Sequence, residues 1–231
     1  MKNGAVVLVS GGIDSATVLA YVSRKLKIPA YALIVNYGQR HEIEITRAVQ
    51  FIQDYDKVEH LIISIDLKSI GGSALTDRNI EIPRNQYPPA KKIIPPTYVP
   101  SRNIIFLSLA ASWAESLGVD KVFYGANNLD YSGYPDCRPD FVIAFEKMLE
   151  KGTKAGVEGH PLKIFTPLMN MQKYEIILWG RELKVDYSKT ISCYQPDQHG
   201  NSCGRCDSCI IRKNAFKQAG IADPTSYVQN Q

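Results

Sequence analysis

The chain has 231 residues, of which 45% are hydrophobic and 22% are charged, and its formal net charge at pH 7 is +4. This length fits one sizeable domain with an appendage, and the apolar content suffices for a core without disulfide bonds. The small positive charge is spread along the chain, which suits anionic small molecules better than nucleic acid. The sequence shows neither an apolar run that could span a bilayer nor a signal-peptide pattern, and it therefore predicts a cytoplasmic protein.

Short apolar runs alternate with helical patterns along most of the chain. Runs rich in β-branched residues predict buried strands at residues 5–9, 31–35, 60–65, 121–124 and 162–165. A helical pattern carries Leu19, Val22 and Leu26 on one face, and further helices are predicted at 42–53, 103–117, 141–151 and 173–184. Such alternation implies right-handed crossovers, and therefore an α/β fold with a doubly wound parallel sheet covered on both faces.

Two segments interrupt this alternation. Residues 71–100 contain Gly71-Gly72 and repeated prolines, which exclude regular structure and predict a long loop that is a candidate lid. After Tyr187 the chain changes character, and four of its five cysteines lie between Cys193 and Cys209. We therefore expect an α/β domain over residues 1–187 and a metal-binding tail with a terminal helix over residues 188–231.

The segment SGGIDS at residues 10–15 lies where the first predicted strand turns into a helix. Two glycines let the backbone approach an anion, and successive N–H groups at a helix N-terminus form an anion-binding nest. The hydroxyls of Ser10 and Ser15 add donors, and no lysine follows as in the GxxxxGKS/T loop. The alternative is an ordinary tight turn with Asp14 or Ser15 as the helix N-cap.

These residues resemble the signature of the N-type ATP pyrophosphatases, whose loop grips the pyrophosphate of ATP while the α-phosphorus is attacked. The resemblance implies cleavage of ATP to AMP and pyrophosphate with Mg²⁺, and Asp14 is the carboxylate expected to help hold that ion. Asp14 and Ser15 are the expected catalytic residues of the loop. The nucleotide-binding residues implied by the resemblance are Val9, Ser10, Gly11, Gly12, Ile13, Asp14, Ser15, Ala16, Thr17, Val18 and Leu19.

The tail carries four cysteines at metal-ligand spacing, namely Cys193, Cys203, Cys206 and Cys209. Four thiolates in a closed site suit one tetrahedral Zn²⁺ with a structural role. An iron–sulfur cluster and a redox Cys-x-x-Cys pair are the competing interpretations. His199 lies between the ligands and could replace one cysteine, but with four cysteines available we expect it to be solvated.

Further motifs narrow the resemblance to one family. They are YGQRH at 37–41, SALTD at 73–77, VPSRN at 99–103, DYSGYPDCR at 130–138, TPL at 166–168 and TISCY at 190–194. Together with SGGIDS and the cysteine tail, in this order, they are similar to the 7-cyano-7-deazaguanine synthase (QueC) family, which implies the adenine nucleotide alpha hydrolase-like (HUP-type) fold. The family more often has glycine where Ser101 stands, although serine is also a good N-cap for the helix predicted near Asn103.

The resemblance also implies a substrate site beyond the carboxyl ends of the strands, where open α/β sheets bind ligands. Arg40 and Arg102 are expected to be catalytic and to hold phosphate or the substrate carboxylate, with a surface ion pair as the alternative. Asp130 and Asp136 are expected to accept hydrogen bonds from a guanine-like edge, with turn formation as the alternative. Adenylation needs no thiol, so Cys137 is expected to be an unreactive wall residue. The expected substrate-binding residues are Tyr37, Gln39, Arg40, His41, Arg102, Asn103, Asp130, Tyr134, Asp136 and Arg138.

The activity implied by the resemblance is an ATP-dependent ligase that forms carbon–nitrogen bonds. It would convert 7-carboxy-7-deazaguanine to the nitrile through an adenylated carboxylate and an amide, in the pathway to queuosine or archaeosine in tRNA. Free ammonia is the expected nitrogen source, because 231 residues leave no room for a glutaminase domain. A homodimer is implied, without a membrane or direct nucleic-acid partner. The alternatives are a related enzyme that adenylates another acceptor, such as a tRNA base, and a zinc-ribbon nucleic-acid-binding module.

Overall fold

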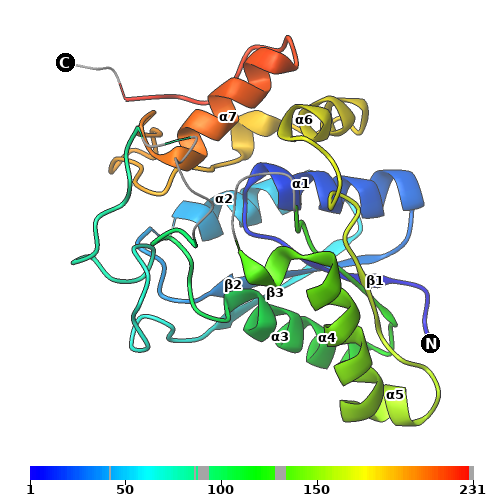
Figure 1. Ribbon diagram of the computed structural model, residues 1–231. Coiled ribbons are helices and arrows are strands. Elements are labelled where there is room, and N and C mark those ends of the chain that lie inside the picture. Colours follow the sequence, from blue (N-terminus) through cyan, green and yellow to red (C-terminus); the bar gives the residue numbers. More distant parts are fainter. Residues whose placement is uncertain (42, 86, 88–93, 128–133, 229–231) are drawn as a thin grey trace.

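A five-stranded parallel sheet forms the centre of the protein (Figure 1). The computed structural model describes residues 1–41, 43–85, 87, 94–127 and 134–228. Along the sheet the strand order is β3-β2-β1-β4-β5, and every neighbouring pair is parallel. The strands are β1 (Ala5–Leu8), β2 (Ala30–Asn36), β3 (Val58–Ser64), β4 (Lys121–Phe123) and β5 (Lys163–Phe165). After β3 the chain crosses to the other side of β1, which confirms the predicted doubly wound parallel sheet.

Helices cover both faces of the sheet (Figure 1). On one face lie α1 (Ile13–Ala20), α2 (Ile43–Ile52), α6 (Lys173–Glu182) and α7 (Asp207–Gln218). On the other lie α3 (Arg102–Leu117), α4 (Pro139–Gly152) and the short α5 (Lys154–Val157). Successive strand residues point to opposite faces, so Ala5 and Val7 enter the first layer and Val6 the second. Burial on both faces explains why the strand sequences read as continuous apolar runs.

The predicted strands and helices are present, but the first helix has two parts. α1 ends at Ala20, and a π-helix, η1 (Tyr21–Leu26), continues to Lys27 in the left-handed conformation. The single-turn 3₁₀ helices η2 (Pro135–Cys137) and η3 (Tyr187–Lys189) were not predicted, because elements this short have no readable period. Position 42, where one helix was predicted to begin, lies outside the described residues.

The C-terminal tail packs onto α1 and α6. Phe216 of α7 belongs to the same buried cluster as the apolar residues of α1. The Tyr187 hydroxyl donates to the Ile176 carbonyl at 3.1 Å and lies 2.8 Å from Thr17 Oγ1. A Cβ at Gly180 would lie 1.8 Å from that hydroxyl oxygen, so glycine is required for α6 to pass this close. The tail therefore completes one of the two cores of the sheet.

The described part of residues 71–100 forms turns and no helix or strand. An isolated bridge joins Arg84 to Cys206, and the Asn85 N–H donates to the Arg205 carbonyl at 2.9 Å. Within the segment, the Ala74 N–H donates to the Pro96 carbonyl at 2.8 Å. The bonds of Arg84 and Asn85 fasten the proline-rich segment to the cysteine-containing tail, which lies far from it in sequence.

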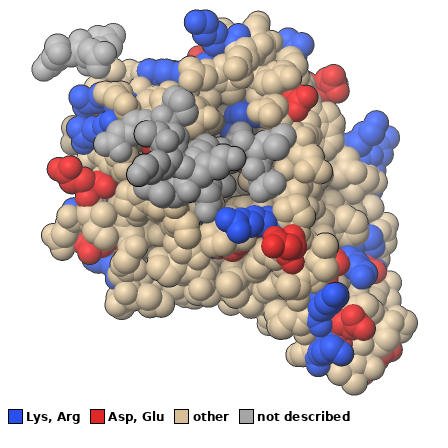
Figure 2. Space-filling model, viewed as in Figure 1, with Lys and Arg blue, Asp and Glu red and all other residues tan. Residues whose placement is uncertain are grey.

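The surface carries both signs of charge. On the face shown in Figure 2, basic and acidic side chains are interspersed over the described residues and do not gather into one basic stripe. A nucleic-acid-binding face of the zinc-ribbon kind would concentrate lysine and arginine on one side. Within the part of the chain that the structure describes, no helix has the length and apolar character needed to cross a membrane.

Ser101 occupies the N-cap position of α3, but in the left-handed conformation, with φ +57° and ψ +18°. Its hydroxyl makes no capping hydrogen bond, so the expectation that Ser101 caps the helix through its side chain is wrong. The left-handed conformation brings the β-carbon of an L-residue too close to the backbone, and glycine is free of that penalty. This explains why glycine is the more usual residue at this position in the family that the motifs indicate.

We predict that Ser101→Gly raises the free energy of unfolding by about 0.5 kcal/mol. The gain from relieving a left-handed serine, ~1 kcal/mol, exceeds the extra entropy that glycine loses on folding. Urea denaturation followed by circular dichroism would measure the change. The matched control is Ser108→Gly, an exposed position inside the same helix, which should lower stability by ~0.5 kcal/mol. Equal destabilisation by both changes would contradict the strain at Ser101.

Candidate active site

A cavity of about 350 Å³ opens at the carboxyl ends of β1, β2 and β4. The chain leaves β1 and β4 toward opposite faces of the sheet, and doubly wound sheets bind their ligands in the crevice formed at that point. One wall is the loop of residues 10–15 with the start of α1, and another is the start of α3. The position agrees with that expected from the sequence.

Gly11 determines the course of the loop. Its φ is +81°, and a Cβ on it would lie 2.7 Å from the Glu44 carbonyl oxygen and 3.1 Å from the Ala48 nitrogen, both in α2. Glycine is therefore required for the conformation and for the approach of α2. The Gly11 carbonyl accepts a hydrogen bond from the Ile191 N–H at 2.9 Å, which ties the loop to the tail.

The two serines of the loop are held against each other. The Ser10 N–H donates to Ser15 Oγ at 3.1 Å, and the two hydroxyl oxygens lie 3.2 Å apart. Gly12 is the N-cap of α1 and no side chain caps the helix, so the alternative in which Asp14 or Ser15 is the N-cap is wrong. Uncapped N–H groups at the start of α1 can serve an anion.

The predicted nucleotide-binding residues divide into two groups. Those that line the cavity are Val9, Ser10, Gly12, Ile13, Asp14 and Ser15. Those that are buried outside its lining are Ala16, Thr17, Val18 and Leu19, while Gly11 supports the turn. The four buried residues pack beneath the loop and have no surface in the cavity.

Lys173 is a cavity residue that sequence reasoning missed. Its ammonium donates to both carboxylate oxygens of Asp14, at 2.8 and 2.7 Å, and both side chains line the cavity. Lys173 is the first residue of α6, whose start is fixed by the Gln172 N–H donating to Glu175 Oε2 at 2.6 Å. The capping pair predicts where a helix begins, but nothing local indicates that this lysine meets a carboxylate 159 positions away.

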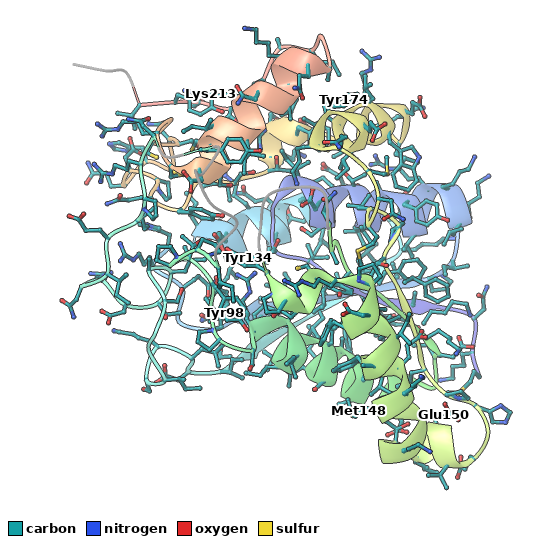
Figure 3. The ribbon with its side chains drawn as sticks, viewed as in Figure 1. Tyr98, Tyr134, Met148, Glu150, Tyr174 and Lys213 are labelled. Atoms are coloured by element: carbon teal, nitrogen blue, oxygen red, sulfur yellow. The ribbon has the colours of Figure 1, made fainter. Side chains whose placement is uncertain are left out.

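Arg102 presents a cation surrounded by aromatic rings at the other end of the cavity. Its guanidinium carbon lies 5.8 Å from the ring centroid of Tyr37 and 6.0 Å from those of Phe106 and Tyr134. Burial alone would lower the pKa of Arg102, but the neighbouring Tyr37 and Tyr134 raise it above its ordinary value. Burial also raises the pKa of Tyr37 to about 12. Figure 3 shows Tyr134 beside Tyr98, and their ring centroids are 5.7 Å apart.

Asp136 supports the start of α3 from outside the cavity lining. Its Oδ2 accepts a hydrogen bond from the Asn103 N–H at 3.1 Å, while its buried Oδ1 has no partner in the described part of the chain. Asn103 in turn donates to Cys137 Sγ at 3.3 Å. Cys137 lines the cavity, and burial raises the pKa of its thiol to about 12. Asp130, expected to act beside Asp136, lies outside the described residues.

Besides Asp136, three more of the expected substrate-binding residues do not line the cavity, namely Arg40, His41 and Arg138. The Arg40 guanidinium donates to the carbonyls of Asp77 at 2.6 Å and Ile80 at 2.5 Å. These bonds are neither the expected anion contact nor a surface ion pair, and they hold the proline-rich segment. Burial and the nearby Arg40 lower the pKa of His41, whose buried Nε2 has no partner among the described residues. Arg138 is exposed at the N-cap of α4, whereas Gln39 does line the cavity.

The tail cysteines form one compact cluster. Their Sγ atoms all lie within 4.8 Å of one another, and the cluster contains Cys193, Cys203, Cys206 and Cys209. Four sulfurs bound to one ion at ~2.3 Å lie about 3.8 Å apart, whereas the cysteines of an iron–sulfur cluster are divided among several irons and spread further. Backbone N–H groups of Gln195 and Cys203 donate to Cys193 Sγ, as thiolates require. His199 is exposed and outside the cluster, so the residues fit a single tetrahedral ion.

Comparison with known proteins identifies the family. The sequence model of the family described as "Queuosine biosynthesis protein QueC" matches residues 4–220 of the chain. The chain belongs to the QueC family. A 7-cyano-7-deazaguanine synthase from Dechloromonas aromatica (strain RCB) is 52% identical over 98% of this chain and 99% of its own length. A protein of the same name from Thiobacillus denitrificans (strain ATCC 25259 / T1) is 51% identical over 99% and 100%. The resemblance drawn from the sequence motifs is thereby confirmed.

A more distant similarity exists among solved structures. U34-tRNA thiolase NcsA from Methanococcus maripaludis aligns with a TM-score of 0.48 and 20% identity over 94% of this chain and 67% of that one. At this distance the alignment carries no argument about the substrate of the QueC family member. The informative comparison is with the relatives that align over almost the whole length of both chains.

We predict that Cys137 resists alkylation in the folded protein. Its pKa of about 12 leaves almost no thiolate at pH 8, and thiolate is the reacting form. Iodoacetamide treatment of the metal-loaded protein, followed by peptide mass spectrometry, should find Cys137 unmodified until the chain is denatured. Because protonation opposes the reaction, the rate should rise with pH. Rapid labelling of Cys137 in folded protein at pH 8 would contradict its burial beside Asn103.

Proposed function

We propose that this chain is a ligase that uses ATP to convert 7-carboxy-7-deazaguanine and ammonia into 7-cyano-7-deazaguanine. The observation that carries the proposal is full-length identity of about 50% to proteins of that name. The cavity supports it, because one wall offers anion-binding backbone groups and the other offers a cation among aromatic rings. The nitrile would serve the pathway to queuosine or archaeosine in tRNA, and tRNA itself would not be bound.

The chemistry explains why ATP is needed twice. A carboxylate is a poor electrophile because its charge is delocalised and oxide is a poor leaving group. Transfer of AMP to the carboxylate supplies a good leaving group, and attack by ammonia then gives an amide. A second ATP activates the amide oxygen, and loss of AMP leaves the nitrile. Both rounds need the same positions for the acyl carbon and the phosphates, so one cavity suffices.

The residues of the cavity fit these roles. The backbone N–H groups between Ser10 and Ser15 would receive the pyrophosphate of ATP at the start of α1. Arg102 would hold the substrate carboxylate, and the flat faces of Tyr37 and Phe106 would contact the bicyclic base. Magnesium, if held by the Asp14 carboxylate, would neutralise phosphate oxygens. Lys173 already lies against Asp14 and would bring a further positive charge to the phosphates.

We further propose that the four tail cysteines hold one structural Zn²⁺. The site is closed by protein ligands, so it has no open position for catalysis. It lies in the segment that bonds to the phosphate loop through Ile191, and it would keep that segment in place. We also expect the chain to act in the cytoplasm as a homodimer, as the family resemblance implies.

The direct test is product analysis by mass spectrometry after incubation with 7-carboxy-7-deazaguanine, ammonia, ATP and magnesium. We expect the nitrile with AMP and pyrophosphate, and a fall of ~100-fold or more in turnover for Asp14→Asn, which removes the carboxylate that would hold magnesium at the phosphates. Asp54→Asn is the matched control, because Asp54 pairs with Lys189 away from the cavity. Intact substrate and ATP from folded, metal-loaded protein would overturn the assignment.

Removal of one metal ligand should release the ion and loosen the tail. We predict that Cys203→Ser lowers bound zinc from about one equivalent to well below half, since a closed site needs all four ligands. Metal content by plasma mass spectrometry and Tm by scanning calorimetry would measure the effect, because zinc binding contributes up to ~10 kcal/mol of folding free energy. Unchanged metal content would show that the ion, if any, binds elsewhere. Cys137→Ser is the control outside the cluster.

A further inference from the structure

Glu44 is a cavity residue with no assigned role. It lies in the first turn of α2, and its side chain lines the cavity together with the phosphate loop, Arg102 and Asn103. Within the described ranges, no residue forms a hydrogen bond or an ion pair with its carboxylate. Enclosed carboxylates are normally bonded to a donor or a cation. Glu44 is half-buried and lines the cavity, so its carboxylate is available to a cation that enters the cavity.

The surroundings of Glu44 set its protonation. Burial raises the pKa of this carboxyl to about 7, and the positive charge of Arg102 opposes the rise. Burial and the charge of Glu44 both raise the pKa of Tyr37, which follows β2. On the opposite wall Asp14 and Lys173 are paired with each other. A carboxylate in this setting can both accept and release a proton near neutral pH.

The proposed reaction needs such a group. Ammonia exists mainly as ammonium at neutral pH, and it must lose a proton before its nitrogen can attack. The other groups of the cavity are poorly suited to accept that proton. Arg102 and Lys173 are cations, Asp14 is already paired, and the thiol of Cys137 is protonated. Asp207 also lines the cavity and its buried Oδ1 has no partner among the described residues, but it lies between Cys206 and Cys209 of the cysteine cluster. Glu44 is the described cavity carboxylate next to the phosphate loop that is not paired with a cation.

We propose that Glu44 binds the nitrogen donor as ammonium and accepts its proton as the nitrogen attacks the adenylated carboxyl carbon. The inference rests on the proposed function and assigns a further catalytic residue to it. Ammonium gives one proton to Glu44, and the freed electron pair forms the C–N bond. The C–O bond to AMP then breaks with its electron pair on AMP, and a second proton leaves the nitrogen for solvent. Glu44 returns its proton to solvent before the next round.

The decisive variant is Glu44→Gln, which keeps the size of the side chain but cannot accept a proton. Nitrile formation from ammonia should fall by ~100-fold, the usual contribution of a general base. In a single turnover, the first burst of substrate-dependent pyrophosphate release should stay within ~3-fold, because adenylation precedes the nitrogen step. Hydroxylamine, which is largely uncharged at neutral pH, should restore acyl transfer in the Gln variant to near the wild-type rate, giving the hydroxamate. Glu59→Gln, an exposed carboxyl on β3, is the matched control.

The pH profile gives an independent readout. In the wild type, kcat/KM for ammonia should fall as pH drops through about 7, because Glu44 becomes protonated and can no longer accept a proton. Relative to the wild type, the Gln variant should lose that limb and Glu44→Asp should keep it. Ammonia-dependent turnover unchanged in Glu44→Gln would overturn the assignment. So would equal loss of the single-turnover pyrophosphate burst and of nitrile, because Glu44 would then serve base binding or adenylation.

The two proposals fail in different ways. A wild-type chain that forms no nitrile overturns the proposed function and with it the role of Glu44. A wild-type chain that forms nitrile, combined with failure of hydroxylamine to rescue Glu44→Gln, overturns only the role of Glu44. Pyrophosphate release by each variant shows at the same time that the protein is folded and binds ATP.

Discussion

The close approach of α2 to the backbone of Gly11 is the constraint on which the site depends. With φ at +81° and a carbonyl oxygen of α2 only 2.7 Å from where a Cβ would be, the loop has one available course. That course starts α1 at Ile13 and leaves its first N–H groups facing the cavity. It also brings Glu44, which belongs to the contacting turn of α2, to the same cavity as the loop. This wall of the cavity is therefore formed by the packing of α2 against the loop.

The same turn links the cavity to the cysteine cluster. Ile191, which donates to the Gly11 carbonyl, is two positions before Cys193. Arg212 is 2% exposed and holds the adjoining segment by donating to the Tyr187 carbonyl at 3.0 Å and to Thr190 Oγ1 at 2.9 Å. Burying a guanidinium is costly unless its donors are satisfied, and the Asp223 carboxylate completes the set of acceptors. The cysteine cluster is thus joined to the cavity by a short peptide that is itself held in place.

Sequence patterns predicted the features that depend on neighbouring residues. The strands, the phosphate loop and the cysteine cluster each have a local signature, and the position of Arg102 at the start of a helix followed from such a pattern. Features that depend on tertiary contacts had none. Arg40 directly follows a cavity residue in the sequence, but its side chain donates to carbonyls of a distant segment. Lys173 and Glu44 reach the cavity from helices whose orientation is decided by packing. The left-handed Ser101 shows a third case, in which a departure from the family residue was visible but its backbone cause was not.

The contact between Thr17 and Tyr187 joins positions 170 apart, and it lies under the helix that carries the phosphate loop. Long-range contacts of this kind form late, because the chain must close a large loop before they stabilise anything. Until α7 and η3 have docked, α1 is covered on one side only, and apolar residues such as Leu19 and Phe216 remain accessible. A newly made chain would consequently expose an aggregation-prone surface until its C-terminal region emerges from the ribosome. Chaperone dependence and low recovery of C-terminally truncated forms are the expected signs of this folding order.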